Sequence, residues 1–232
     1  MSDPVRVALV AEGPTDRIIM EGAIRSMLGE RTFMLKQIQP EGSLVFGEQG
    51  TGWCGVYRWC KQAALRGNGH LSGDRLVFST YDLLLLHLDA DVAENNYKDC
   101  GVQPAPGDAV LPCQRPCPPA FDTTNALRVV LLSWCGETVV PGKTVVCVPS
   151  KSTEAWVLAA LFPEDPAVGP GLECLAHPES RFGQQPISKR IRKSQRDYQD
   201  QSDRIESGWP TAALLGEAAR FQADFLQAVQ TI

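Results

Sequence analysis

Short apolar runs alternate along this chain with segments whose apolar residues recur at helical spacing. A continuous apolar run of a few residues between turn residues is typical of a buried strand. Such runs occupy Val5–Val10, Phe33–Ile38, Leu83–Leu88 and Thr144–Val148. Helical periodicity after each strand predicts helices over residues 15–28, with Thr15 or Asp16 as the N-cap, over Trp53–Leu65 and Thr124–Cys135, and over 152–161, with Ser152 as the N-cap.

The remaining segments have a different character. Residues 40–52 and 163–186 are expected to be loops, and residues 187–206 are polar and strongly charged. The segment Thr211–Val229 has the period of one last amphipathic helix. Its buried stripe is expected to consist of Leu214, Leu215, Ala218, Phe221, Phe225 and Leu226.

Strands that alternate with helices predict an α/β fold, with a Rossmann-like, mostly parallel central sheet flanked by helices. This core is expected to span residues 1–162, and residues 163–232 would add a loop and a helical C-terminal extension. Residues 92–122 interrupt the pattern with six prolines and three cysteines. A connection of this length is typically functional or mobile. It is expected to be either a wall of the site or a variable surface insertion.

The composition is that of a globular protein, with 44% hydrophobic and 21% charged residues and a net charge of −5. No apolar run approaches the length of a membrane span, and the N-terminus lacks the features of a signal peptide. A cytoplasmic location without membrane contact is therefore expected. The cysteines should then be reduced, as core residues or as loop thiols. The expected core residues are Cys54, Cys60, Cys135 and Cys147, and the expected loop thiols are Cys100, Cys113 and Cys117.

Carboxylates follow two of the predicted strands. Glu12 comes directly after the first strand, and Asp89 and Asp91 come after the third. Ligands of parallel sheets bind outside the carboxyl ends of the strands, so these side chains are expected to converge there. If the third strand continues, Asp89 and Asp91 point to the same side. Such a carboxylate cluster is expected to hold a hard cation, Mg²⁺ or Mn²⁺, and zinc is not expected because Cys113 and Cys117 lack a second well-spaced pair.

The spaced motifs Glu12–Asp16 (EGPTD) and Asp89–Asp91 (DAD), together with the segment 148–156 (VPSKSTEAW), resemble the Toprim fold. This fold occurs in topoisomerases, bacterial primases, recombination-repair proteins and the overcoming-lysogenization-defect (OLD) nucleases. The likeness spans residues 5–162 and is nearest to the small OLD-like proteins, many of which act in antiphage defence.

The resemblance implies a metal-dependent nuclease. Glu12 matches the family's general base or metal ligand, and Asp89 and Asp91 match its metal-binding aspartates. Asp16 and Glu154 match acidic positions that help to hold a second Mg²⁺ or Mn²⁺ ion. The chain has no Walker A sequence, so any ATPase would be a separate partner.

Five basic residues lie within eight positions that contain no acidic residue: Lys189, Arg190, Arg192, Lys193 and Arg196. One interpretation is a contact with the phosphate backbone of nucleic acid, with Lys189 stabilising negative charge that develops in the reaction. The other is a solvated helix face balanced by the aspartates that follow. His87 is expected to be a buried, hydrogen-bonded histidine.

Two functions remain open from the sequence. The first is a nuclease that cleaves DNA or RNA, as an effector of a bacterial defence system. The second is a non-catalytic interaction subunit of a complex that contains an ATPase. A homo-oligomer is compatible with either function.

Overall fold

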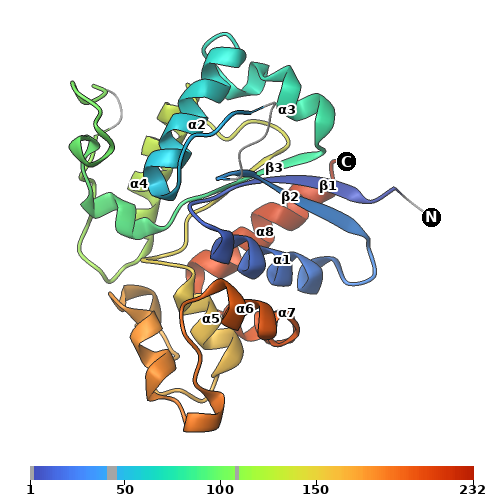
Figure 1. Ribbon diagram of the computed structural model, residues 1–232, viewed down its shortest axis with the longest axis vertical. Helices are drawn as coiled ribbons and strands as arrows, with labels where there is room; N and C mark the ends of the chain where they lie inside the picture. Colours follow the sequence, from blue (N-terminus) through green and yellow to red (C-terminus); the bar gives the residue numbers. More distant parts are fainter. Residues whose placement is uncertain (1–2, 41–45, 108–109) are drawn as a thin grey trace.

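A computed structural model describes residues 3–40, 46–107 and 110–232 of the chain. Its centre is a four-stranded, entirely parallel sheet in the order β2-β1-β3-β4 (Figure 1). The strands are β1 (Val5–Val10), β2 (Phe33–Gln39), β3 (Leu83–His87) and β4 (Thr144–Cys147). All four predicted strands are confirmed, with ends that differ by one residue at β2, β3 and β4. The predicted α/β class with a parallel sheet is therefore correct.

The strand order reverses between β1 and β3. The chain passes from β1 outward to β2 and then returns across β1 to form β3 and β4. Connections on the two sides of this point leave in opposite directions, and ligands of such sheets usually bind outside the carboxyl ends of the strands at this point. Glu12 and Asp89 follow these two strands.

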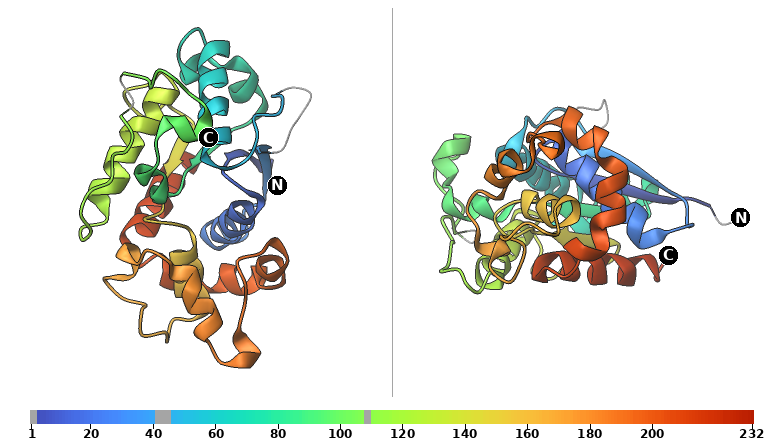
Figure 2. Two further views of the ribbon diagram at one scale, coloured as in Figure 1. Left: turned by 60° about the vertical axis from the view of Figure 1, so that its left-hand side comes forward. Right: turned by 90° about the horizontal axis from the view of Figure 1, so that it is seen from below.

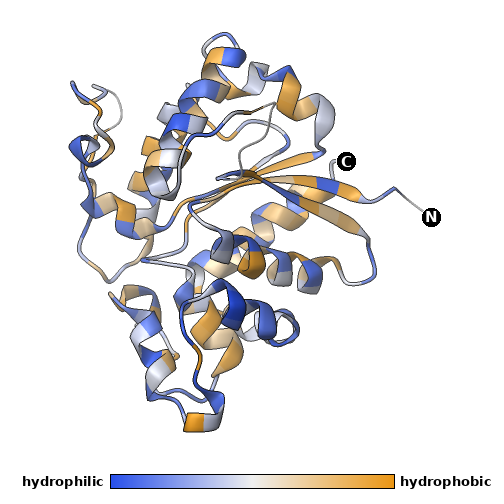
Figure 3. Ribbon diagram, viewed as in Figure 1, coloured by the Kyte–Doolittle hydropathy of each residue, from blue (hydrophilic) through white to orange (hydrophobic). Residues whose placement is uncertain are grey.

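Helices cover both faces of the sheet (Figure 1). Alternate residues of a strand point to opposite faces, so Val7 and Leu9 enter one core while Ala8 and Val10 enter the other. The hydropathy colouring shows the apolar strands between helices with polar outer faces (Figure 3). The helices are α1 (Pro14–Leu28), α2 (Gly52–Arg66), α3 (Arg75–Thr80), α4 (Phe121–Trp134), α5 (Glu154–Leu161), α6 (Gln195–Asp200), α7 (Ser202–Ala212) and α8 (Gly216–Val229).

The C-terminal segment shares a core with the N-terminal half of the chain. The cluster that contains Val7 also contains Trp156 of α5, Trp209 of α7 and Phe221 of α8, all buried. Viewed from below, the orange and red C-terminal elements lie on the α1 side of the sheet (Figure 2, right). None of the helices described in residues 3–40, 46–107 and 110–232 is long and apolar enough to cross a membrane.

Two predicted N-caps are wrong, and α4 starts at Phe121 rather than at the predicted Thr124. The first helix begins at Pro14 with Gly13 as its N-cap. Proline suits this first position because it has no N–H to leave unpaired. Asp16, expected as a cap, instead accepts the Gly13 N–H through Oδ2 at 2.9 Å. The N-cap of α5 is Thr153 rather than Ser152.

The last predicted helix is two helices. The segment Thr211–Val229 is interrupted between α7 and α8, and Leu214 in the break is 83% exposed. The carboxylate of Glu173 accepts the backbone N–H groups of Gly216 and Glu217 at 2.9 and 2.8 Å and so caps the new helix. This cap comes from a distant segment, which explains why periodicity alone joined the two helices. The expected stripe is buried at Leu215, Ala218, Phe221 and Phe225, whereas Leu226 is half-buried.

Four of the cysteines form disulfides, although all of the cysteines are expected to be reduced. Cys54 is bonded to Cys100 and Cys117 to Cys174, with Cα–Cα distances of 5.3 and 5.6 Å. Their partners lie 46 and 57 residues away, a proximity that the sequence does not reveal. The bonds attach segment 92–122 to α2 at one end and to the C-terminal segment at the other. Cys60, Cys135 and Cys147 are buried core residues, as predicted.

Short elements complete the description. Helix α3 was not predicted. Within segment 92–122, 3₁₀ helices form at Ala90–Glu94 and Tyr97–Cys100, and residues 108–109 lie outside the described chain. Part of the predicted loop 40–52, residues 41–45, also lies outside it.

Candidate functional site

The structure brings Glu12 and Asp89 into contact. Strands β1 and β3 pair side by side from Val7 with Leu83 to Val10 with Leu86. The carboxyl ends of both strands therefore lie together. The backbone N–H of Asp89 donates a hydrogen bond to Glu12 Oε1 at 3.0 Å. Asp89 is buried and Glu12 is half-buried.

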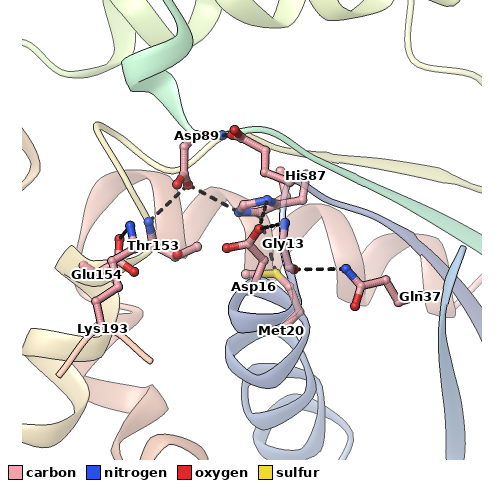
Figure 4. A network of polar contacts seen from close by, with 11 residues as sticks. Gly13, Asp16, Met20, Gln37, His87, Asp89, Thr153, Glu154 and Lys193 are labelled. Carbon is pink, nitrogen blue, oxygen red and sulfur yellow. Dashed lines mark hydrogen bonds and ion pairs between the residues drawn. The ribbon is translucent and has the colours of Figure 1, made fainter. Parts of the chain in front are cut away.

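Two further acids complete the cluster (Figure 4). Asp16, from the first turn of α1, lies buried beside His87. Glu154 begins α5 and is fully buried. The N–H of its neighbour Thr153 donates to Asp89 Oδ1 at 3.2 Å, which ties the start of α5 to the end of β3. Glu12, Asp16, Asp89 and Glu154 thus surround the carboxyl ends of β1 and β3.

Asp91 lies at the rim of this cluster. The chain turns into a 3₁₀ helix at Ala90, so the strand does not continue and its alternation does not set the direction of Asp91. The backbone N–H of Asp91 donates to the carbonyl of Lys151 at 3.0 Å. Asp91 is exposed. The surrounding protein partly shields the Asp91 carboxyl from water and so raises its pKa. The charges of Lys193 and Lys151 act in the opposite direction.

The carboxylates destabilise one another's charged forms. Burial, followed by the charge of Asp16, raises the pKa of Glu12 to about 8, although the Asp89 N–H and Lys193 act in the opposite direction. Burial and then the charges of Asp16, Glu12 and Glu154 raise the pKa of Asp89 well above its usual range. Without a cation, therefore, the site favours bound protons on the carboxyl groups of Glu12 and Asp89.

Lys193 is the basic residue that reaches the carboxylates. Its Nζ donates to Glu154 Oε2 at 2.9 Å, while the Tyr198 hydroxyl donates to Glu154 Oε1 at 3.1 Å. Burial lowers the pKa of Lys193, but the charge of Glu154 and the hydrogen bond to it outweigh burial and raise the pKa overall. The same carboxylate and the burial of the phenol raise the pKa of Tyr198.

The other basic residues point elsewhere. Lys189, expected beside the reacting groups, is half-exposed and pairs with the exposed Glu164 at 3.3 Å. Arg190 donates through Nε to the carbonyl of Gln185 at 2.9 Å. Arg192 and Arg196 are exposed. The segment therefore offers one lysine to the cluster and exposes the other basic residues at the surface.

A groove adjoins the cluster. It has a volume of about 310 Å³ and is lined by Asp91, Glu94, Lys151, His177 and Lys193 among others. Lys151 Nζ pairs with Glu94 Oε1 at 2.6 Å. Sequence reasoning missed Lys151 and Tyr198 as site residues. Lys151 lies within the quoted segment 148–156 and could have been found there, whereas no sequence signal connects Tyr198 with Glu154.

His87 departs from its expected environment. It is fully buried, as predicted, but neither ring nitrogen has a hydrogen-bond partner within the described chain. Unpaired ring nitrogens beside the buried carboxyl groups of Asp16 and Asp89 fit a place for a cation, and the oxygen donors suit Mg²⁺ or Mn²⁺. In the arrangement seen, however, no three His, Cys, Asp or Glu side chains of the described residues already have metal-ligand spacing. Binding of a cation would require the carboxylates to turn away from the backbone N–H groups whose hydrogen bonds they now accept.

Comparisons with known proteins add no assignment. No protein-family model, no curated protein and no solved structure matches this chain. The likeness to the Toprim fold therefore depends on the quoted motifs and on the geometry of the residues within them.

Proposed function

We propose that this chain is a Toprim-like, divalent-cation-dependent nuclease that hydrolyses phosphodiester bonds of DNA or RNA. The observation that supports the proposal most is the contact between Glu12 and Asp89, which unites two motifs from distant parts of the chain. They meet at the point of a parallel sheet where the strand order reverses, which is the usual ligand position in such sheets.

Glu12, Asp16, Asp89, Asp91 and Glu154 would hold one or two Mg²⁺ or Mn²⁺ ions. Such ions, when bound, supply an activated water molecule and stabilise the leaving oxygen. A bound cation would favour the charged form of Glu12, against the burial and the charge of Asp16 that raise its pKa in the cation-free protein.

Lys193 would orient the substrate phosphate. Its ammonium lies between Glu154 and the groove that Asp91 also lines. A positive charge at this position offsets the repulsion between the carboxylates and a phosphodiester. The exposed residues Arg192 and Arg196 would extend the positive surface along the nucleic-acid backbone. By the same resemblance, we propose that the protein acts as an effector of antiphage defence.

The test is cleavage of single-stranded DNA, duplex DNA and RNA pools with Mg²⁺ or Mn²⁺. Glu12→Gln and Asp89→Asn should lower the rate by at least about 100-fold because each removes a charge from the reacting centre. Glu30→Gln, an exposed glutamate beyond α1, is the matched control and should leave the rate unchanged. Circular dichroism must show the same fold in all variants. Cleavage by Glu12→Gln at the wild-type rate would exclude Glu12 from the mechanism.

The alternative is an interaction subunit, with an ATPase as a separate partner. One observation favours it: Glu12, Asp89 and Glu154 each accept hydrogen bonds from the protein itself. These bonds join the ends of β1 and β3, the start of α5 and the segment that contains Lys193. Such bonds are expected of structural carboxylates. Absence of cleavage by the wild-type protein, with every substrate and with any ATPase that co-purifies, would favour this alternative over the nuclease.

A further inference from the structure

The groove beside the carboxylate cluster is lined by segments that lie far apart in the chain. One side begins the Pro-rich segment 92–122 and consists of Asp91, Glu94 and Asn95. Another side belongs to the C-terminal segment and consists of Ala176, His177 and Glu179. The remaining lining residues are Lys151, Ser152 and Lys193. Because the two sides come from separate parts of the chain, the width of the groove depends on what holds them together.

Hydrogen bonds fasten a later part of segment 92–122 to the first side of the groove. The carbonyl of Ala93 accepts the N–H groups of Cys113 and Gln114 at 2.8 and 3.1 Å. The side-chain amide of Gln114 donates to Glu94 Oε1 at 2.8 Å. Cys117 follows Gln114 by only three residues. A constraint on Cys117 therefore also constrains the residues that line this side of the groove.

The disulfide between Cys117 and Cys174 connects the two sides of the groove. Cys174 lies two residues before Ala176, the first lining residue of the other side. The residue before Cys174 makes further contacts in the same region. The carbonyl of Glu173 accepts a hydrogen bond from the Ser150 hydroxyl, and its carboxylate caps α8. The disulfide thus joins two walls of the groove at a point that also touches the start of the predicted motif 148–156.

The exposure of this disulfide distinguishes it from the other one. Cys117 and Cys174 are both half-buried, whereas Cys100 of the Cys54–Cys100 disulfide is buried. Thiols reach an exposed disulfide more readily, and labile or regulatory disulfides are typically of this kind. Between Cys100 and Phe121, the described residues form no helix or strand. No regular structure of these residues would therefore replace the bond if it opened.

We propose that the Cys117–Cys174 disulfide is a redox-controlled clasp of the groove. In the oxidised protein the bond holds the two sides together, and in the reduced protein they separate and open the groove to solvent. The Cys54–Cys100 disulfide remains closed during this change and anchors the first part of segment 92–122 to α2. The inference goes beyond the proposed function, because it requires neither a bound cation nor the cleavage of nucleic acid.

The reductant of the clasp is a dithiol. Its thiolate attacks one sulfur of the bond and forms a mixed disulfide, and the other cysteine leaves as a thiolate. The second thiol of the reductant then displaces the cysteine that remains bound. The reductant becomes a cyclic disulfide, and Cys117 and Cys174 together gain two electrons and two protons. The same steps in reverse close the clasp.

The first measurement compares the two disulfides in the full wild-type chain. The protein is equilibrated with mixtures of reduced and oxidised dithiothreitol, free thiols are alkylated, and the state of each bond is assigned from peptide masses. Cys117–Cys174 should open at a ratio of reduced to oxidised reagent at least about tenfold lower than Cys54–Cys100. Opening of both bonds together, or of Cys54–Cys100 first, would overturn the proposal. Absence of the Cys117–Cys174 bond in the fully oxidised reagent would overturn it as well.

The second measurement tests whether opening the bond opens the groove. Lys151 lines the groove and its side chain is only 16% exposed, whereas Lys61 is exposed on α2, outside the groove. An acetylating reagent should modify Lys151 several-fold faster in protein in which only Cys117–Cys174 is reduced. The rate at Lys61 should not change. Equal rates at Lys151 in the oxidised and reduced protein would overturn the clasp and leave the bond a purely structural one.

Variants separate loss of the bond from the presence of the reductant. Cys117→Ser/Cys174→Ser should show fast modification of Lys151 without any reductant, and added reductant should not change that rate. Cys113→Ser removes a free thiol from the same segment, and as the matched control it should respond to reduction as the wild type does. A slow rate at Lys151 in the double variant would contradict the clasp. If the double variant does not fold, the two measurements on the wild type still decide.

Discussion

Replacing Glu12 with glutamine should remove a pH-dependent loss of stability from the cation-free protein. The substitution keeps the size of the side chain and the oxygen that accepts the Asp89 N–H, but it removes the charge. In the folded protein, burial and then Asp16 raise the pKa of Glu12 from 4.5 to about 8. The folded state therefore binds more protons than the unfolded state between these two pH values.

The sign and size of the effect follow from this difference. Because the folded state holds the extra proton, the free energy of unfolding falls as pH rises through the window from about 4.5 to about 8. A rise of the pKa over that interval corresponds to roughly 5 kcal/mol, shared among the carboxyl groups that repel one another. Glu12→Gln should therefore be more stable than wild type above this window, by up to that amount, and nearly equal to it below.

The assay is urea unfolding with a chelator present, at about pH 4.5 and about pH 8.5. Glu30→Gln serves as the control, because Glu30 is exposed and its loss should not change the slope of stability with pH. Added Mn²⁺ should stabilise the wild type at the higher pH by mass action. Equal pH dependence in the wild type and in Glu12→Gln would refute the idea that Glu12 lies among repelling, buried carboxylates.

Two other features can be tested. Replacing Arg192 and Arg196 with glutamine should reduce the slope of log affinity for duplex DNA against log salt concentration by about two, because each exposed arginine would contact one phosphate. An unchanged slope would show that these arginines only face solvent. Removing the disulfide with Cys117→Ser and Cys174→Ser should cost about 4 kcal/mol of stability, because the bond closes a separation of 57 residues. Unaltered urea unfolding, judged against the free Cys113→Ser, would contradict that bond.

The strands and the meeting of Glu12 with Asp89 could be predicted because they depend on local patterns. An apolar run such as Leu83–Leu86 is buried on both faces, as is typical of a central parallel strand. Parallel strands point their carboxyl ends to one edge, so residues that follow them converge. These two rules sufficed to place Glu12 beside Asp89 across 77 residues.

The partners of individual side chains could not be predicted. Lys189 and Lys193 have the same chemistry and lie four positions apart, yet only the path of the chain between Pro186 and α6 brings Lys193 to Glu154. The condition for the expected direction of Asp91, a strand that continues past Asp89, is not met because a 3₁₀ helix starts at Ala90. The position of α1 likewise decides whether His87 has a hydrogen-bond partner, because it leaves Asp16 Oδ2 3.9 Å from His87 Nδ1.

The sequence by itself thus determined the α/β class, the four strands and the edge of the sheet at which carboxylates gather. These properties follow from the apolar composition and the periodicity of each segment, which do not depend on the rest of the chain. Only the tertiary structure decided the disulfide pairs, the break between α7 and α8, the choice of Lys193 and the isolation of the His87 nitrogens. Each of these depends on a distance between segments that are far apart in sequence, and such distances are set by packing of the whole chain.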